Sequence, residues 1–257
     1  MENVKTLRTK TLWATLAIFG VSFALIYLSL YVIIPLTVQK GMNFGYSYLI
    51  FFYYPFALLL ITALVLIKAE AKGRKLTWAM FKNRYRLNKF DRTTVLWTTG
   101  LFVFWFVLLI FIEPAVGKAL AKIPFFAPNT CFPPEINPNV PPAAPGVMFG
   151  MALHGKWWIP LIYFAGWFFN IFGEELLFRG YLLPKQEAAF GKYAWLIQGS
   201  FWGLWHFFWK WNFPVLFITC LALSFVAQKT KNTWVGIIVH GSLNFVPLIM
   251  IIISVIK

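Results

Sequence analysis

Long apolar runs recur along this 257-residue chain, and they constrain its fold more than any other feature. Each run holds roughly 20 residues, which is the length of helix that crosses about 30 Å of hydrocarbon. Hydrophobic residues make up 60% of the chain and charged residues only 12%, so a water-soluble fold would expose much of this apolar surface. The sequence therefore predicts an all-α integral membrane protein of about seven to eight transmembrane helices.

We expect seven spans, and an eighth re-entrant or surface element is the alternative. The expected spans are Leu12–Leu36, Tyr46–Ile67, Thr94–Ile112, Trp157–Leu183, Tyr193–Trp211, Phe213–Gln228 and Trp234–Ile256. The fourth span is expected to end at Pro184, because proline cannot continue the helical hydrogen-bond ladder. The first span lacks a small-residue cleavage site after it, so we interpret it as retained and not as a signal peptide.

The net charge of +15 raises the question of a nucleic-acid partner, but the basic residues cluster at the edges of the spans. Between Lys68 and Arg92, nine Lys or Arg residues stand against Glu70 and Asp91, and aromatic residues are interleaved with them. Such a stretch is typical of a cytoplasmic loop with an interfacial amphipathic segment. We therefore expect a multi-pass protein of the cell membrane with a cytoplasmic amino terminus, the lipid bilayer as a partner, and no nucleic acid.

The chain is expected to form one membrane domain with two parts. Residues 1–156 would hold the N-terminal membrane helices, the basic cytoplasmic loop at 68–92 and a Pro-rich outer loop at 125–145. Residues 157–257 would form the helical core that carries the polar site. The proline content of the outer loop favours extended backbone without a packed core. We interpret this loop as a linker lying over the spans, and a gate is the alternative.

Ionisable side chains stand inside the C-terminal spans, where each costs about 2.5 to 3.5 kcal/mol even on the lenient insertion scale. Glu174 and Glu175 are adjacent there. Because Glu175 and Arg179 are four residues apart, they meet on one helical face and can neutralise each other. Glu174 is turned by roughly 100° from Glu175, so it is left free to face a cavity.

Two further spans carry His206 and the pair His240 and Asn244, whose spacing places the imidazole and the amide side by side. Taken singly, each group has a structural interpretation as an ion-pair clamp or a helix–helix hydrogen bond. Together they supply a carboxylate, two imidazoles and an amide on three spans. Simple helix packing does not require that combination, so we expect a chemical site.

These residues resemble a known family. A Glu-Glu-x-x-x-Arg motif begins at Glu174, a motif ending in histidine closes at His206, and His-x-x-x-Asn begins at His240. In this order on successive spans, the motifs are similar to those of the CPBP family, the CAAX-type and bacteriocin-processing (Abi-type) intramembrane proteases. That family includes the Rce1-like prenyl-protein endopeptidases. The resemblance covers about residues 157–256.

The resemblance implies a glutamate-dependent endopeptidase that hydrolyses a peptide bond inside the bilayer without a cofactor. Glu174 would be the general base that polarises a water molecule together with His206. His240 and Asn244 would form the oxyanion hole. A peptide or membrane protein would be the substrate, with a prenylated carboxyl terminus and a leader peptide as alternatives.

Three supporting residues complete the implied site. Glu175 and Arg179 would fix the helix end and orient Glu174. Trp202 holds the position where the family usually has phenylalanine four residues before the histidine, which preserves an aromatic side chain and changes the shape of the pocket. For His206 to reach the depth of Glu174, we expect an interfacial turn before the fifth span. We also expect a cavity that opens toward the cytoplasmic half of the membrane.

Two other classes of function stay open from the residues alone. A zinc-dependent membrane metalloprotease would use Glu174, His206 and His240 as metal ligands and leave a fourth position for water. The His-Glu-x-x-His helix of common zinc peptidases is absent from the sequence. A non-enzymatic membrane protein, either a scaffold or immunity protein or a transporter, would use the buried acid and histidines for packing or as a proton relay.

Overall fold

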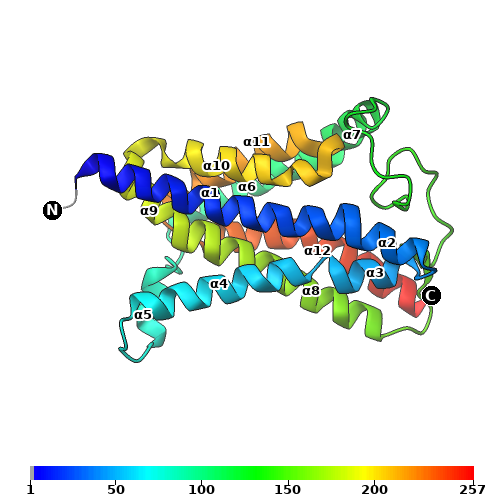
Figure 1. Ribbon diagram of the computed structural model, residues 1–257, viewed down its shortest axis with the longest axis horizontal. Coiled ribbons are helices and arrows are strands. Elements are labelled where there is room, and N and C mark those ends of the chain that lie inside the picture. The colour runs from blue at the N-terminus through cyan, green and yellow to red at the C-terminus, as the bar shows by residue number, and fades with distance from the viewer. Residues whose placement is uncertain (1–2) are drawn as a thin grey trace.

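The computed structural model describes residues 3–257, and helices dominate it (Figure 1). Within these residues, five helical stretches are long and apolar enough to cross a membrane. Their outer faces carry apolar side chains such as Phe111 and Leu161, which are 67% and 70% exposed, while Glu175 and Arg179 are buried. Apolar surface outside and polar groups inside suit a lipid environment, and the predicted all-α membrane fold is confirmed.

The N-terminal half forms three long rods and one short surface helix. The first rod joins α1 (Val4–Leu28), a π-helical turn and α2 (Ile34–Gln39), and the second rod holds α3 (Phe44–Phe51) and α4 (Tyr54–Glu70). The short surface helix is α5 (Trp78–Arg84). The third rod consists of α6 (Arg92–Val107), π-helical η2 (Leu108–Ile112) and α7 (Glu113–Leu120). The third rod continues beyond the predicted end at Ile112. It therefore carries Glu113 to the level of the Pro-rich loop.

The C-terminal half begins with a two-stranded hairpin and continues as helices. Its elements are β1 (Val147–Met148), β2 (Met151–Ala152), α8 (Trp158–Glu174), π-helical η3 (Glu175–Leu182), α9 (Leu183–Phe190), a 3-10 turn η4 (Gly191–Tyr193), α10 (Ala194–Trp205), 3-10 helical η5 (His206–Asn212), α11 (Phe213–Thr230) and α12 (Trp234–Ile256). Helix α8 packs against α4 and α12, so the candidate residues on α8 and α12 face each other inside the bundle.

The prediction that the fourth span ends at Pro184 is wrong. The helix passes through the π-helical segment η3 and continues as α9 to Phe190, with Pro184 in the first turn of α9. A proline deprives an earlier carbonyl of its helical partner. Arg84 supplies a donor in its place, because its guanidinium donates to the carbonyl oxygen of Gly180 at 3.1 Å, and it also donates to that of Tyr181 at 3.3 Å.

The α-helix of the predicted fifth span is shorter than expected, and a turn precedes it. The chain turns at Gly191, whose φ of 60° suits glycine, and η4 leads into α10. Regular α-helix ends at Trp205 with His206 as its C-cap, and Trp209 has non-helical backbone angles inside η5. His206 therefore stands at a helix end, where its side chain can reach into the bundle instead of lying along a continuous helix.

The basic loop at 68–92 is anchored to the bundle. Tyr85 is fully buried, and its hydroxyl donates a hydrogen bond to the carbonyl oxygen of Ala63 at 2.5 Å. The amide of Thr233 donates to the carbonyl oxygen of Arg86 at 3.0 Å, so the loop also holds the start of α12. Figure 1 shows α5 at the same end of the bundle as the start of α1, and α7 and the C-terminus at the other end.

Candidate active site

Glu174 is the last residue of α8 and is only 1% exposed. The amide nitrogen of Asn170, one turn earlier, donates to Oε1 at 2.7 Å. The indole nitrogen of Trp202 on α10 donates to Oε2 at 2.7 Å. Each carboxylate oxygen therefore accepts a hydrogen bond from a neutral donor, and together the two donors orient the carboxylate.

Glu175 forms the ion pair with Arg179 that helical spacing predicts, and both side chains are fully buried. The Nε of Arg179 donates to Oε2 of Glu175 at 2.7 Å, and its Nη2 bonds Oε1. The Nδ1 of His240 lies 3.0 Å from the same Oε1, so Glu175 links α8 to α12. A side chain on Gly236 would collide with this carboxylate, which explains a glycine at that position.

His240 is held between aromatic rings. The indole of Trp105 on α6 stacks on its imidazole, with centroids 5.7 Å apart and an angle of 12°. Trp202 meets the imidazole edge-on at 5.5 Å. The amide nitrogen of Asn244 donates to the carbonyl oxygen of His240 at 3.0 Å. Since an amide has two N–H donors, Asn244 keeps one for another acceptor.

His206 lies where α10 gives way to η5. Its Nδ1 is 2.9 Å from the carbonyl oxygen of Trp202 and 3.4 Å from the sulfur of Cys220. The ring contacts Trp202 and Trp205 edge-on at 5.2 and 5.0 Å. A nitrogen beside a carbonyl oxygen carries the proton, which leaves Nε2 as the acceptor.

A small cavity of about 150 Å³ brings the four candidate residues together. Glu174, His206, His240 and Asn244 all line it, and Asn170 completes its polar wall. Tyrosine and phenylalanine side chains of α3 and α4, with Tyr163, Trp167, Phe208 and Trp209, form the remainder. The structure thus gathers residues from three separate helical segments around one space.

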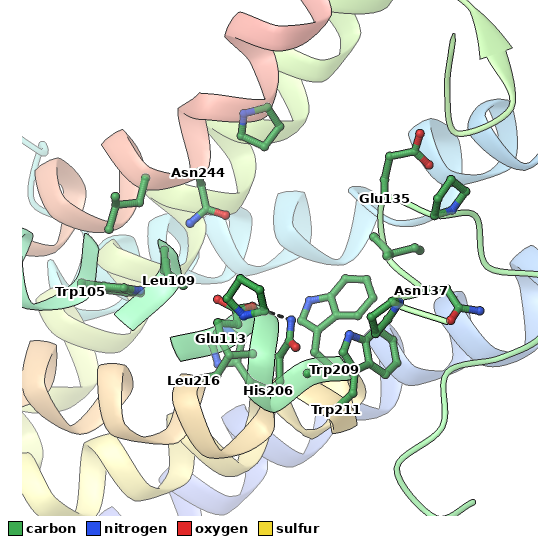
Figure 2. Close-up of a pocket in the computed structure, with 18 of the residues that line it drawn as sticks. Trp105, Leu109, Glu113, Glu135, Asn137, His206, Trp209, Trp211, Leu216 and Asn244 are labelled. Atoms are coloured by element: carbon green, nitrogen blue, oxygen red, sulfur yellow. Dashed lines mark hydrogen bonds between the residues drawn. The ribbon is translucent and has the colours of Figure 1, made fainter. Parts of the chain in front are cut away.

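A large cavity of about 490 Å³ shares His206, Trp209, His240 and Asn244 with the small one. It extends between α6, α7 and α12 to the Pro-rich loop, and Figure 2 draws Trp105 and Leu109 on one side and Glu135 and Asn137 on the other. The loop is therefore a cavity wall and more than a linker.

This geometry links two expectations from the sequence, the side of the basic loop and the direction in which the cavity opens. The large cavity reaches the end of the bundle opposite to α5 and the basic loop. The basic loop and the opening of the cavity therefore cannot both lie on the cytoplasmic side. If the basic loop is cytoplasmic, as its nine clustered charges predict, the large cavity opens toward the opposite side of the membrane, and both placements stay predictions.

The alternative zinc ligands are not arranged as a metal site. Across residues 3–257, no group of three or more His, Cys, Asp or Glu side chains is placed to hold a metal ion. Both oxygens of Glu174 accept hydrogen bonds from neutral donors, and the Nδ1 atoms of His206 and His240 face a carbonyl oxygen and Glu175. The Nδ1 contacts leave each Nε2 free, as in metal-binding histidines, so the metalloprotease alternative stays open to experiment.

Several residues at the site were missed by sequence reasoning. Asn170 lies four residues before Glu174, and that helical spacing could have identified it. The indole of Trp167 donates to the carbonyl oxygen of Gly241 at 3.0 Å, and that bond joins α8 to α12. Trp105 comes from the N-terminal half, and nothing in its sequence context distinguishes it from a lipid-facing aromatic residue.

Comparison with known families agrees with the motifs. Residues 156–246 match the family model described as type II CAAX prenyl endopeptidase, Rce1-like. Comparison with curated proteins and with solved structures finds no match. The matched segment contains Glu174, His206, His240 and Asn244, and the resemblance noted from the motifs is confirmed. In residues 156–246 this membrane protein therefore carries a domain of the Rce1-like family of CAAX-type intramembrane proteases.

Proposed function

We propose that this chain is an intramembrane endopeptidase in which Glu174 and His206 activate water, while His240 and Asn244 stabilise the scissile carbonyl oxygen. The small cavity carries the proposal, because these four side chains line it and Glu174 is otherwise buried. A volume of about 150 Å³ has room for water beside a peptide group, since one water occupies about 30 Å³.

The reaction would proceed by acid–base chemistry. Glu174 takes a proton from water as the water oxygen bonds to the carbonyl carbon of the substrate. The carbonyl oxygen then carries the negative charge, and preorganised donors at that oxygen lower the barrier by about 2.7 to 4 kcal/mol each. When the C–N bond breaks, Glu174 returns its proton to the amine nitrogen and the carboxylate is restored.

The hydrogen bonds of the two imidazoles support different roles. The Nδ1 of His206 faces a carbonyl oxygen, so its Nε2 can accept a hydrogen bond from the attacking water. The Nδ1 of His240 faces Glu175, and a donor at Nε2 therefore requires the imidazolium form. An imidazolium beside the developing oxyanion adds charge stabilisation to the hydrogen bond.

His240 lies among three other buried ionisable side chains, Glu174, Glu175 and Arg179. With Glu174 and Glu175 ionised and Arg179 and His240 protonated, the four groups sum to zero. A low-dielectric interior strongly disfavours an unbalanced charge, whereas a balanced and hydrogen-bonded set is tolerated. In this arrangement Glu175 is a positioning residue, because it orients His240 without reaching the reacting atoms.

The test is cleavage of a peptide panel by the purified protein in detergent. Glu174→Gln removes the proton acceptor with little change of volume, and we expect its cleavage rate to fall at least about 10³-fold. Asp91→Asn is the matched control, because it makes the same acid-to-amide change at the helix cap of α6, where asparagine also caps. Full cleavage by a folded Glu174→Gln protein would refute the proposal.

The same panel separates the alternative functions. Loss of cleavage with a chelator, restored by zinc, would replace this mechanism by a metalloprotease. A scaffold or transporter would leave the whole panel uncut, and its biological function would survive Glu174→Gln in a protein that is still made and inserted.

A further inference from the structure

The large cavity has a charge that the composition of the chain does not predict. The whole chain carries 23 Lys and Arg residues against 8 Asp and Glu residues. Yet among the described residues that line this cavity, the only Lys, Arg, Asp or Glu side chains are Glu113 and Glu135. Within a basic protein, the part of this cavity away from His206 and His240 therefore carries acidic side chains and no lysine or arginine.

The carboxylate of Glu113 is held in place by neighbouring residues. It is half-buried at the start of α7, and the amide nitrogen of Asn212 donates to its Oε1. A side chain on Gly117 would lie 2.5 Å from Oδ1 of Asn212, so the glycine makes room for this amide. The contact orients one carboxylate oxygen and leaves Oε2 available for a ligand.

A second observation, independent of the carboxylates, points to a ligand in the same cavity. Trp105 lines it and is only 4% exposed, yet its indole nitrogen has no hydrogen-bond partner. Figure 2 draws this nitrogen on the side of the ring that faces the cavity. A buried donor without a partner is unfavourable, and a ligand carbonyl oxygen would satisfy it.

We propose that the large cavity binds a segment of the substrate that carries a positively charged side chain, with Glu113 as its partner. The indole of Trp105 donates to a backbone carbonyl of that segment. The proposal rests on the proposed function only where it names this ligand a substrate.

The geometry also predicts how far the positively charged residue of the substrate lies from the scissile bond. Trp105 stacks on His240, and Glu113 follows it by eight residues on a continuous helix, or about 12 Å at 1.5 Å per residue. An extended peptide advances about 3.4 Å per residue. The cationic residue therefore lies roughly three to four residues from the scissile bond.

Binding can be measured without catalysis in the Glu174→Gln background. Labelled apolar peptides that differ at one scanned position, with lysine, methionine or glutamate there, are titrated in neutral detergent and followed by fluorescence anisotropy. We expect the lysine peptide to bind at least about tenfold more tightly than the glutamate peptide at one position of the scan, a difference of about 1.4 kcal/mol. Equal affinities at every position would overturn the proposal.

Two further variants assign the effect to one carboxylate. Glu113→Gln keeps an acceptor for Asn212 and should abolish the preference for lysine, whereas Glu135→Gln on the exposed loop should retain it. If Glu135→Gln and not Glu113→Gln removes the preference, the assignment to Glu113 is wrong. Cleavage of the same peptides by native protein locates the scissile bond. A lysine effect more than about five residues from that bond would contradict the geometry.

These readouts separate the two proposals. A charge preference in binding with no cleavage of any peptide would refute the endopeptidase and leave the cationic site standing. Cleavage and binding that do not depend on the charge of the peptide would refute the cationic site and leave the endopeptidase proposal standing.

Discussion

At the scale of single residues, Trp202 connects the groups of the candidate active site. Its indole nitrogen bonds Glu174, the guanidinium of Arg179 lies 3.6 Å over its ring, and its carbonyl oxygen faces His206. From the sequence it was a substitute for phenylalanine in a packing role. The indole adds a hydrogen-bond donor that phenylalanine lacks, so the substitution affects the candidate base as well as the shape of the pocket.

Trp202→Phe should lower kcat by about 10- to 100-fold in peptide cleavage. The change removes one hydrogen bond to a carboxylate, which contributes about 1.5 to 3 kcal/mol, while an aromatic ring remains over Arg179. Trp195→Phe on the same helix is the control, because that ring packs on Phe225 away from the site. An unchanged kcat in folded Trp202→Phe protein would contradict a positioning role for the indole.

At the scale of helices, glycines at the crossing points allow neighbouring helices to approach each other closely. Gly236 on α12 leaves room for the Glu175 carboxylate, and a side chain on Gly173 of α8 would lie 2.6 Å from the carbonyl oxygen of Phe56 on α4. Such small residues allow membrane helices to pack closely. The polar core is thereby assembled from α8 and α12 with little space between them.

Gly236→Ala should destabilise the protein by about 2 kcal/mol, because the added methyl group displaces the Glu175 carboxylate from Arg179 and His240. Thermal unfolding in detergent measures the effect, and cleavage activity should fall with it. Gly100→Ala on α6 is the matched control, since its methyl group would have no neighbour within 4 Å. If both variants unfold at the same temperature as native protein, the packing argument fails.

At the scale of the whole molecule, ion pairs hold the basic loop against the ends of the helices. Glu187 on α9 pairs with Arg86 at 2.8 Å and with Lys231 at 2.5 Å. These contacts join the loop, α9 and the segment before α12. They fix the end of the bundle that we assign to the cytoplasm.

Glu187→Gln should reduce the free energy of unfolding by about 1 kcal/mol, because Lys231 is half exposed and water screens its share of the attraction. The difference from native protein should shrink in 1 M salt, where charges are screened within about 3 Å. Unfolding measured at low and high salt tests this. A loss that does not depend on salt would show that packing, and not charge, is responsible.

Membrane orientation is a second prediction at this scale. With the native Cys131 replaced by serine, a cysteine at Lys75 in the basic loop and one at Ala144 in the Pro-rich segment should label from opposite sides of the membrane. We expect the first only after permeabilisation of cells and the second in intact cells, by the positive-inside rule. The reverse pattern would place the large cavity on the cytoplasmic side.

The sequence by itself determined the all-α membrane class, the Glu175–Arg179 pair and the family that residues 156–246 resemble. Those features depend on apolar run length, spacing along one helix and an ordered set of motifs, and all of them are local. Only the tertiary structure decided that the helix passes Pro184, that Trp202 bonds Glu174, and that a cavity with acidic side chains adjoins the site. Each of these depends on side chains far apart in sequence, such as Arg84 at the Gly180 carbonyl and Asn212 at Glu113, and helical periodicity carries no record of which helices become neighbours.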